Sequence, residues 1–576
     1  MTNDERTNMR LLVEKVMDGF SSIKINEEIY SILKDQIDSF PFLVDYAGIC
    51  KLECKKQKEG ALYWISPVSS YITITKKLVY IDDSRVDVMI EYFDGSTIKK
   101  CRADREEILS KISVKSLLKK GILFNESHCD SLLSFLLQSD NRAPVEHVHS
   151  HLGWIEMEGV KVFRSYESLC KNGDLQFKSH YVGNLDLTPH GSIQKWLDVV
   201  KHDILPHTPL TFCLLLGFAA PVLSRLYRKY DLGSLVFCLS NISSLGKTTA
   251  AMVYASVFSN PVLGSGTVQS FNATQNYLMS LLAEASGLTV ILDEGATFNG
   301  DFNQLFYLIS AGKDKNRLDK KAEMRTSLEW NSIVLTTAEF IPVDDNSPDG
   351  IRTRCFCLTD RMTKNAGHAD RIKAVIAENY GHAGNEFVTW LLNADVDLET
   401  DYKRCKKNLH NELRVAGLQE GPFTSRVFSR LAIVLQVANY VSQCFSLNIR
   451  IKHLIKYILR IERNVNKQTD STQKALDNIL AEVSCSSSRY ISAAKMNPDN
   501  AVGKVEQSGG FKLITILRPE FNRICKKYGL PPKLILKKFK ERKILDCESD
   551  RLSKRVRLQR GFPEQVCYVI KIQDSK

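Results

Sequence analysis

A strand–loop–helix stretch in the middle of the chain constrains its fold more than any other feature. The apolar run SLVFCL leads into SNISSLGKTTA (Ser240 to Ala250), and the helix-compatible run TAAMVYASVF follows. A loop that ends in Gly-Lys-Thr at the start of a helix presents backbone N–H groups to phosphate oxygens, a lysine to the β- and γ-phosphates, and a hydroxyl to Mg²⁺. The stretch predicts a nucleoside triphosphate site in a parallel α/β domain.

The loop departs from the usual glycine-rich pattern at one position. Asn241 stands where such loops usually have their first glycine, and asparagine adopts positive φ more readily than most other residues. Small serines keep the loop close to the phosphates. The expected nucleotide-binding residues are Asn241, Ser243, Ser244, Leu245, Gly246, Lys247, Thr248 and Thr249.

A second apolar strand supplies the acids that such a site needs. GLTVILDEG (Gly287 to Gly295) ends in Asp293 and Glu294, at the order and spacing expected of a Walker B strand. Asp293 is expected to hold Mg²⁺ with Thr248, and Glu294 to polarise the attacking water. The alternative is a buried strand that ends in two solvated acids. Both motifs together predict ATP and Mg²⁺ as cofactors.

Three further residues are candidates for catalysis. The strand NSIVLTTAEF offers Thr337 to help place the water, unless it is only a threonine-rich strand end. In GIRTRCFCL, Arg354 is preferred over Arg352 as the arginine that reaches the nucleotide of a neighbouring subunit. In SRVFSRLAIVLQVANYV, Arg426 is slightly preferred over Arg430 as a sensor 2 arginine. The candidate catalytic set is therefore Lys247, Asp293, Glu294, Thr337, Arg354 and Arg426.

A basic insertion, SAGKDKNRLDKKAEMRTSLEW (Ser310 to Trp330), separates the Walker B strand from the Thr337 strand. At this place it can form a hairpin that points into the pore of a ring, where cations meet the phosphates of a threaded strand. The alternative is a solvated run of charge. The expected DNA contacts are Lys313, Lys315, Arg317, Lys320 and Lys321.

Nearly all of the net charge lies at the C-terminal end. Residues 511–576 hold 18 Lys and Arg against 7 Asp and Glu, an excess of 11 in a chain whose net charge is +12. The order helix, GLPP turn, helix and basic β-like stretch indicates a winged helix, and a concentrated basic module is typical of nucleic-acid binding. The expected DNA contacts are Lys533, Lys537 and Lys538 on the second helix and Lys554, Arg555 and Arg557 in the wing.

The whole chain reads as a multidomain α/β and α+β protein. An Asp94-Gly95 turn between alternating runs indicates a β-hairpin near the N-terminus. We expect an N-terminal α+β domain (1–140), a β-rich and helical segment (141–230), an AAA+ ATPase core (231–362), a helical lid region (363–484), a linker (485–510) and a basic winged helix (511–576).

Other features favour a reduced, cytoplasmic protein without a membrane partner. The longest apolar run, FCLLLGFAAPVL, is too short to span a bilayer and predicts a buried helix. The 15 cysteines include no CxxC pair, so metal ribbons and disulfide frameworks are not expected. HVHSH places His147, His149 and His151 on one strand face, but no nearby carboxylate or cysteine completes a persuasive metal site.

These motifs together resemble a known family. LGWIEMEGVKVF, SNISSLGKTTA, FNATQNYL, VILDEG, SAGKDKNR, IVLTTAEF, NYGHAGNEFVTWLL and SRVFSRLAIVL are similar to the AAA+ helicases of domain-of-unknown-function family 927, over about residues 60 to 576. The closest likeness is to MCM-like replication initiator helicases of staphylococcal cassette-chromosome and pathogenicity-island elements. The resemblance implies a hexameric ring around single-stranded DNA, 3′→5′ ATP-driven unwinding, a C-terminal winged helix, and initiation at a mobile element's own origin, with replication proteins of host or element as possible partners.

Two functions of different kind fit the residues. In the first, ATP hydrolysis moves a ring along single-stranded DNA and separates the duplex, which Glu294 and the basic insertion favour. In the second, a DNA-binding nucleotide switch assembles at an origin or regulates transcription without unwinding, which the C-terminal charge fits equally well. A signalling or defence ATPase is a third class, which predicts no dependence on DNA.

Overall fold

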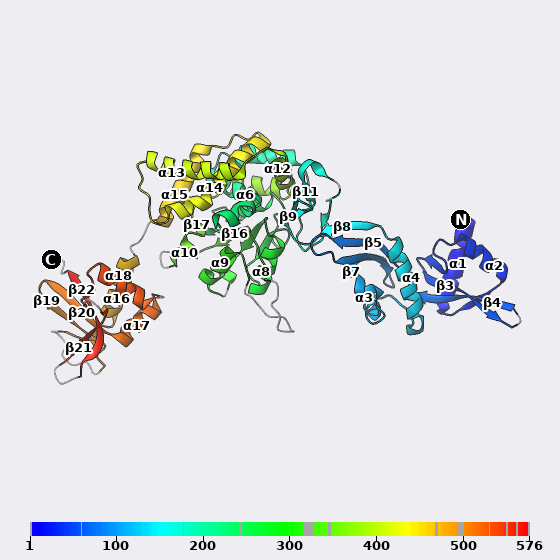
Figure 1. Cartoon of the computed structure of the whole chain (residues 1–576), viewed down its shortest axis with the longest axis horizontal. Helices are drawn as coiled ribbons and strands as arrows, with labels where there is room; N and C mark the ends of the chain where they lie inside the picture. Colours follow the sequence, from blue (N-terminus) through cyan, green and yellow to red (C-terminus); the bar gives the residue numbers. More distant parts are fainter. Residues whose placement is uncertain are drawn as a thin grey trace.

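The computed structural model describes most of the chain, in several bodies that follow one another from the N-terminus to the C-terminus (Figure 1). The described residues are 3–58, 60–174, 176, 178–240, 245–298, 300–314, 327–343, 347–466, 471–492, 500–528, 530–548, 551–559 and 563–573. All the statements below concern these residues.

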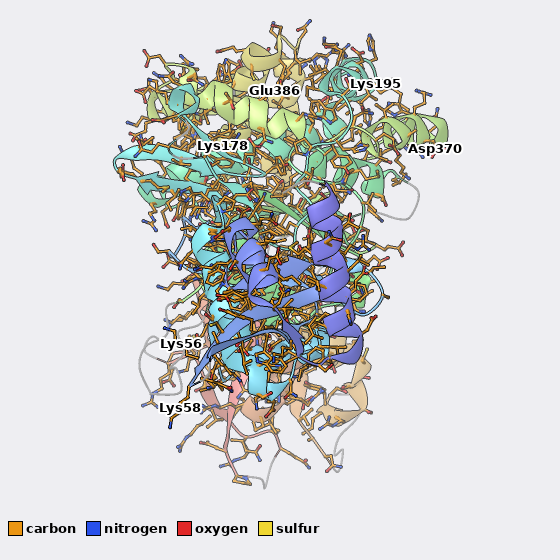
Figure 2. All side chains as sticks on the ribbon, turned by 90° about the vertical axis from the view of Figure 1, so that its right-hand side faces the viewer. Lys56, Lys58, Lys178, Lys195, Asp370 and Glu386 are labelled. Carbon is orange, nitrogen blue, oxygen red and sulfur yellow. The ribbon has the colours of Figure 1, made fainter. Side chains whose placement is uncertain are left out.

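The first body is a four-stranded sheet covered by two helices. Its strand order is β1-β4-β3-β2, and Val13, Val16, Leu43, Cys50 and Ile65 form its core. Lys56 and Lys58 lie at the tip of the β3–β4 hairpin and project away from the body (Figure 2). The elements are α1 (Asn3–Gly19), β1 (Ile23–Ile25), α2 (Glu27–Gln36), β2 (Phe42–Asp45), β3 (Gly48–Gln57) and β4 (Gly60–Ser69).

The second body is a five-stranded sheet with a separate core. The order β12-β8-β5-β6-β7 confirms the expected hairpin, because β6 and β7 pair antiparallel on either side of the Asp94 turn. Strands β8 and β12 lie after residue 140, so the domain boundary expected at that residue would divide this sheet. The sequence did not reveal this, because the parallel pairing of β5 with β8 leaves no local sequence signal. The elements are β5 (Ile72–Tyr80), β6 (Val86–Phe93), β7 (Ile98–Asp104), α3 (Arg105–Leu109), α4 (Cys129–Arg142), β8 (Val145–His149) and β12 (His180–Tyr181).

A small antiparallel sheet and a long buried helix lead into the centre of the molecule. The sheet holds β9 (Gly153–Met157), β10 (Val160–Arg164) and β11 (Ser168–Cys170), and α5 (Ile193–Val199) follows. Helix α6 (Thr208–Tyr230) is long and apolar enough to cross a membrane, but 83% of its most apolar window is buried inside the structure. It is the core helix that FCLLLGFAAPVL predicted.

The central body is a five-stranded parallel sheet flanked by helices. Its order, β14-β15-β16-β13-β17, places β16 between β13 and β15, and every described pairing is parallel. The strands are continuous apolar runs because both faces are covered. The elements are β13 (Leu235–Ser240), α7 (Lys247–Ala255), β14 (Val268–Ser270), α8 (Gln275–Glu284), β15 (Thr289–Asp293), α9 (Phe302–Ala311), β16 (Ile333–Ala338), α10 (Asp349–Arg352) and β17 (Cys355–Leu358).

Five helices follow and share one hydrophobic core with α6 and the parallel sheet. Helix α15 shows why they fold: Leu454, Ile455 and Ile458 are buried on one face, while Lys452 and Lys456 are exposed on the other. The helices are α11 (Ala366–Ile376), α12 (His382–Asn393), α13 (Leu398–Val415), α14 (Thr424–Phe445) and α15 (Ile451–Asn466).

The C-terminal body begins earlier than the sequence suggested. Its core joins Ala475 and Ile479 of α16 to Phe521 and Phe539 of the following helices, and β19 pairs with β20. The segment expected as a linker, 485–510, thus contributes strands to this body. The elements are α16 (Ser471–Cys485), β18 (Tyr490–Ile491), β19 (Gly503–Ser508), β20 (Phe511–Leu517), α17 (Arg518–Lys527), α18 (Pro532–Glu541), β21 (Lys554–Val556) and β22 (Gln565–Gln573).

Candidate nucleotide and DNA sites

The candidate nucleotide site lies at the carboxyl edge of the parallel sheet. Because β13, β15 and β16 run in the same direction, their ends at Ser240, Asp293 and Ala338 meet at one edge. After β13 the chain crosses to β14, which is the outermost strand on one side of the sheet. Strand β17 pairs with β13 and is the outermost strand on the other side. Ligands of open parallel sheets bind at such a point, outside the carboxyl ends of the strands.

The end of the loop is shaped for a close backbone approach. Gly246 has φ +87° and caps α7, which begins at Lys247. A Cβ on Gly246 would lie 2.5 Å from the Oγ1 of Thr363, and the N–H of Met362 donates to the carbonyl of Leu245 at 2.8 Å. The segment after β17 therefore packs directly on the loop. Asn241, Ser243 and Ser244 lie outside the described residues.

The first turn of α7 carries the expected polar groups. Lys247 is half-buried and Thr248 is exposed, whereas Thr249 is fully buried and its hydroxyl has no hydrogen-bond partner among the described residues. The N-terminus of a helix attracts anions. Thr248 and Asp293 offer the oxygen donors that suit Mg²⁺, so the residues present fit this ion.

Thr337 connects the two acids of the β15 end. Its hydroxyl donates to the carboxylate of Asp293 and accepts the backbone N–H of Glu294 at 3.1 Å. Glu294 has φ +62° and ψ +54°, a left-handed conformation that is uncommon for this residue type, and its side chain is exposed. Such outliers cluster at functional sites. The geometry holds Asp293 fixed and turns Glu294 towards solvent.

The candidate arginines lie towards the amino ends of the strands, opposite the candidate nucleotide site. Arg354 directly precedes β17, so the length of a strand, roughly 20 Å for six residues, separates it from the loop after β13. Its guanidinium lies 5.7 Å from the centre of the Tyr307 ring. Arg352 is buried and donates to the carbonyl of Val465 at 2.9 Å, as expected of a structural arginine.

Arg354 belongs to a cluster that includes both sensor 2 candidates. Burial, followed by the like charge of Arg354, lowers the pKa of Arg430 from its ordinary value. Arg430 is 6% exposed, its Nη1 donates to the carbonyl of Arg426 at 3.0 Å, and its Nε has no partner among the described residues. Arg426 itself is exposed. The structure thus brings Arg354, Arg426 and Arg430 together and does not bring them to Lys247.

The expected DNA contacts are described in part. In the basic insertion, Lys313 is exposed and its ammonium lies 3.3 Å from the carboxylate of Glu329, while Lys315, Arg317, Lys320 and Lys321 lie outside the described residues. On α18, Lys533 and Lys537 are exposed and Lys538 is half-buried. In and just after β21, Arg555 and Arg557 are exposed, whereas Lys554 pairs with Asp546 at 2.7 Å.

The three histidines of HVHSH do not form one cluster. His149 is fully buried, and its ring nitrogens contact the hydroxyl of Ser179 at 2.9 Å and the carbonyl of Ser165 at 2.8 Å. Burial lowers the pKa of His149 to about 4, so the ring is neutral near pH 7. His147 and His151 are exposed.

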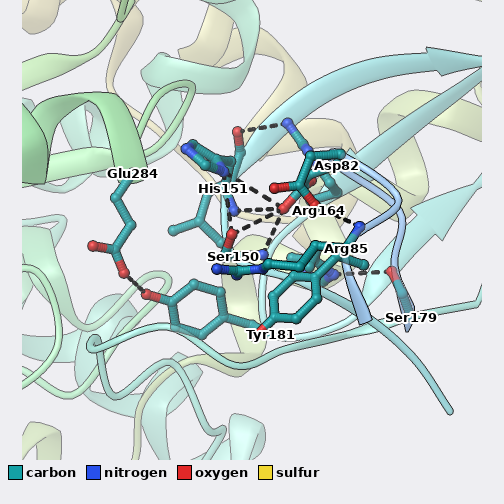
Figure 3. Close-up of polar contacts among 12 residues, drawn as sticks. Asp82, Arg85, Ser150, His151, Arg164, Ser179, Tyr181 and Glu284 are labelled. Atoms are coloured by element: carbon teal, nitrogen blue, oxygen red, sulfur yellow. Dashed lines mark hydrogen bonds and ion pairs between the residues drawn. The ribbon is translucent and has the colours of Figure 1, made fainter. Parts of the chain in front are cut away.

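Polar contacts join the second body to β10 and to α8 (Figure 3). Asp82, in the β5–β6 turn, forms a buried ion pair with Arg164 and accepts the backbone N–H of Ser150 at 2.6 Å. Nearby, the hydroxyl of Tyr181 donates to Glu284, at the end of the helix that precedes β15.

Two family models match parts of the chain. Residues 42–329, half of the 576, match the model described as "Domain of unknown function (DUF927)". The chain belongs to the DUF927 family. Residues 470–575 match the model described as "Cch helix turn helix domain", which begins one residue before α16 and agrees with the early start of the C-terminal body.

A solved structure is similar to this DUF927 protein over nearly its full length. It is described as "SCCmec type IV Cch - active helicase", with a TM-score of 0.69, 22% sequence identity, and coverage of 93% of this chain and 98% of that chain. At this identity the likeness shows a shared fold. No curated protein matches the chain.

Sequence reasoning did not single out Thr363, and it preferred Arg426, which is exposed, over Arg430, which is buried. Thr363 approaches the loop only because β17 lies beside β13, and no local pattern marks it. Arg430 had a signal, since it lies one turn after Arg426 on the same amphipathic helix.

Proposed function

We propose that this protein is an ATP-driven DNA helicase of an MCM-like AAA+ type that initiates replication at a mobile-element origin. One observation carries the proposal: the helix N-terminus at Lys247, the Asp293–Glu294 strand end and the Thr337 hydroxyl lie at one edge of a parallel sheet. The similar fold of the structure described as an active Cch helicase supports it.

The chain's own groups have distinct tasks in ATP hydrolysis. Lys247 and the N–H groups of α7 hold the phosphates, and Thr248 and Asp293 would hold Mg²⁺, which would neutralise charge on the phosphates. Glu294 orients the attacking water and accepts its proton. Thr337 fixes the position of the Asp293 carboxylate relative to the backbone of Glu294.

The position of the arginines supports a ring. Arg354, Arg426 and Arg430 form a cationic cluster too far from this chain's own loop to act on its nucleotide. Arg430 is buried with Asp231 of its own chain nearby, whereas Arg354 is half-buried and Arg426 is exposed, so part of the cluster is open to a neighbouring subunit. A head-to-tail ring, proposed to be a hexamer, brings this cluster to the phosphates bound by the next subunit.

The basic insertion and the C-terminal body are the proposed DNA contacts. The basic insertion (Ser310 to Trp330), which contains Lys313, meets the phosphates of the threaded single strand, and α18 meets duplex DNA. From the resemblance, we propose movement in the 3′→5′ direction and a cytoplasmic location, with replication proteins of host or element as partners.

A DNA-binding switch is the second candidate, because a helix-turn-helix body is present whether or not the ring moves. ATP hydrolysis measured with and without single-stranded DNA separates the two. A motor that tracks a single strand hydrolyses ATP faster when that strand is present. Hydrolysis that responds only to duplex DNA would favour the switch.

A further inference from the structure

A pocket of about 580 Å³ lies at the amino edge of the parallel sheet, away from the nucleotide site. Several parts of the chain line it, among them the β5–β6 turn with Asp82, β9 with Trp154, the end of α6 with Tyr227, and the segments before β15 and β16 with Gly287 and Asn331. Its volume falls in the range of small-molecule sites. None of the tasks proposed above uses it.

Asn331 is the least satisfied polar group of this pocket. Its side chain is buried, with 3% of the residue exposed, and neither amide atom has a hydrogen-bond partner among the described residues. Its backbone is fixed, because its N–H donates to the Oγ of Ser286 at 3.1 Å and its carbonyl accepts the N–H of Gly287 at 2.8 Å. An unpaired buried polar group destabilises the fold, so an external partner is expected.

Aromatic rings paired with arginines form part of the wall. The Arg225 guanidinium lies 5.2 Å from the centre of the Trp154 ring, and that of Arg228 lies 5.5 Å from the centre of the Tyr227 ring. Aromatic rings and guanidinium planes are the surfaces on which single-stranded nucleic acids stack their bases.

Most charges of the pocket are paired. Asp82 is paired with the buried Arg164, as Figure 3 shows. The carboxylate of Glu329 lies 3.6 Å from the guanidinium of Arg228 and 3.3 Å from the ammonium of Lys313. Asp83 also lines the pocket, so the lining holds three acids against two arginines, which disfavours a free anion and is compatible with a neutral, flat, hydrogen-bonding ligand.

We propose that this pocket binds one nucleobase, with its edge on the Asn331 amide and its face against the Trp154–Tyr227 wall. An amide offers a donor and an acceptor side by side, which is how asparagine contacts base edges. The pocket adjoins the base of the Lys313 insertion, so a base of the threaded strand is the nearest source; this source rests on the proposed function. A free nucleoside carries the same chemistry.

The test uses Asn331→Leu, which removes the amide at similar volume and keeps both backbone bonds. Fluorescence anisotropy measures the affinity of the full-length protein for a labelled dA or dT oligonucleotide, and for one that is abasic at every position. We expect Asn331→Leu to weaken binding of at least one base-containing strand about tenfold and to leave the abasic strand unchanged. Ser69→Ala removes a different buried polar group without a described partner, a hydroxyl outside the pocket, and is expected to change neither affinity.

Equal affinities of wild type and Asn331→Leu for both base-containing strands, or equal losses on base-containing and abasic strands, would overturn the proposal. Equilibrium dialysis with adenosine and with thymidine distinguishes the sources. Nucleoside binding that Asn331→Leu abolishes identifies a free base as a ligand, whereas a loss confined to the strands identifies the single strand. If the wild type binds no single-stranded DNA, the helicase proposal fails, and dialysis alone still decides the pocket.

Discussion

Thr337 and Asp293 are joined by a hydrogen bond across neighbouring parallel strands, and the same hydroxyl accepts the backbone N–H of Glu294 at 3.1 Å. One buried side chain thus holds both acids of the candidate site. Its position follows from the strand order, because β16 is inserted between β13 and β15.

Replacing Thr337 with valine removes both hydrogen bonds at similar volume. Because a hydrogen bond to a charged group contributes about 1.5–3 kcal/mol, we expect kcat for ATP hydrolysis to fall roughly 10- to 100-fold while ATP binding persists. Thr337→Ser keeps the hydroxyl and is expected to retain most activity. Steady-state hydrolysis and nucleotide titrations check both variants; a fully active Thr337→Val would remove Thr337 from the mechanism.

Gly246→Ala tests the fit of the loop against the segment after β17. The new Cβ would lie 2.5 Å from the Oγ1 of Thr363, in addition to the strain of a φ of +87°. Gly264 is a matched control, because it has a φ of +79° but no heavy atom of the described residues within 4 Å of the position of a Cβ. We expect both variants to lose about 1 kcal/mol of stability from backbone strain, and only Gly246→Ala to lose ATP binding. ATP binding that is equally strong in both variants would contradict the close packing.

Arg354 is proposed to act across a subunit boundary, and mixed subunits test this. Arg354→Ala and Lys247→Ala proteins are each expected to hydrolyse ATP about 10³-fold or more slowly than wild type. In a mixed ring, the intact Lys247 of one variant can face the intact Arg354 of the other, so mixing is expected to restore part of the hydrolysis. Activity that stays at the level of the separate variants, in rings shown to exchange subunits, would place Arg354 outside the neighbour's site.

Because His149 is buried in a neutral form, we expect the second body to lose folding stability in acid. The pKa of His149 is lowered to about 4 by burial, against about 6.5 in an unfolded chain, so the unfolded state binds more protons below that value. The stability that the neutral ring provides is complete above pH 6.5 and is lost as the pH falls towards 4, by about 2 kcal/mol at pH 5. Urea unfolding at pH 7.5 and 5 checks it.

The matched variants for this measurement are His149→Asn and the exposed His147→Asn. Between the two pH values, His149→Asn is expected to lose less stability than wild type, and His147→Asn as much as wild type. The same pH dependence in all three proteins would show that His149 does not titrate as its burial requires.

The central elements could be predicted because their signals are local. The apolar runs before Lys247 and Asp293 and the run before Thr337 became β13, β15 and β16, and the parallel connection alone places their ends together. The Asp94 turn likewise marks its own hairpin, and residues in and near the turn make its hydrogen bonds.

Long-range packing explains what the sequence did not reveal. The segment 485–510 is polar, yet β19 pairs with β20, and the apolar face of α16 is buried only once the later helices fold against it. The contact of Thr363 with Gly246 depends in the same way on β17 joining the far side of β13. The positions of Arg354, Arg426 and Arg430 depend on how the helices pack against the sheet. The periodicity along one helix does not show whether an arginine lies near the carboxyl or the amino ends of the strands.

Unwinding of a forked DNA with a 3′ single-stranded arm tests the central claim most directly. Wild type, Lys247→Ala and Glu294→Gln are compared in the presence of ATP and Mg²⁺. We expect the wild type to separate the strands, Lys247→Ala to fail because it cannot hold the phosphates, and Glu294→Gln to bind ATP but leave the fork closed. A wild-type protein that hydrolyses ATP and never opens the fork would contradict the helicase and favour the switch.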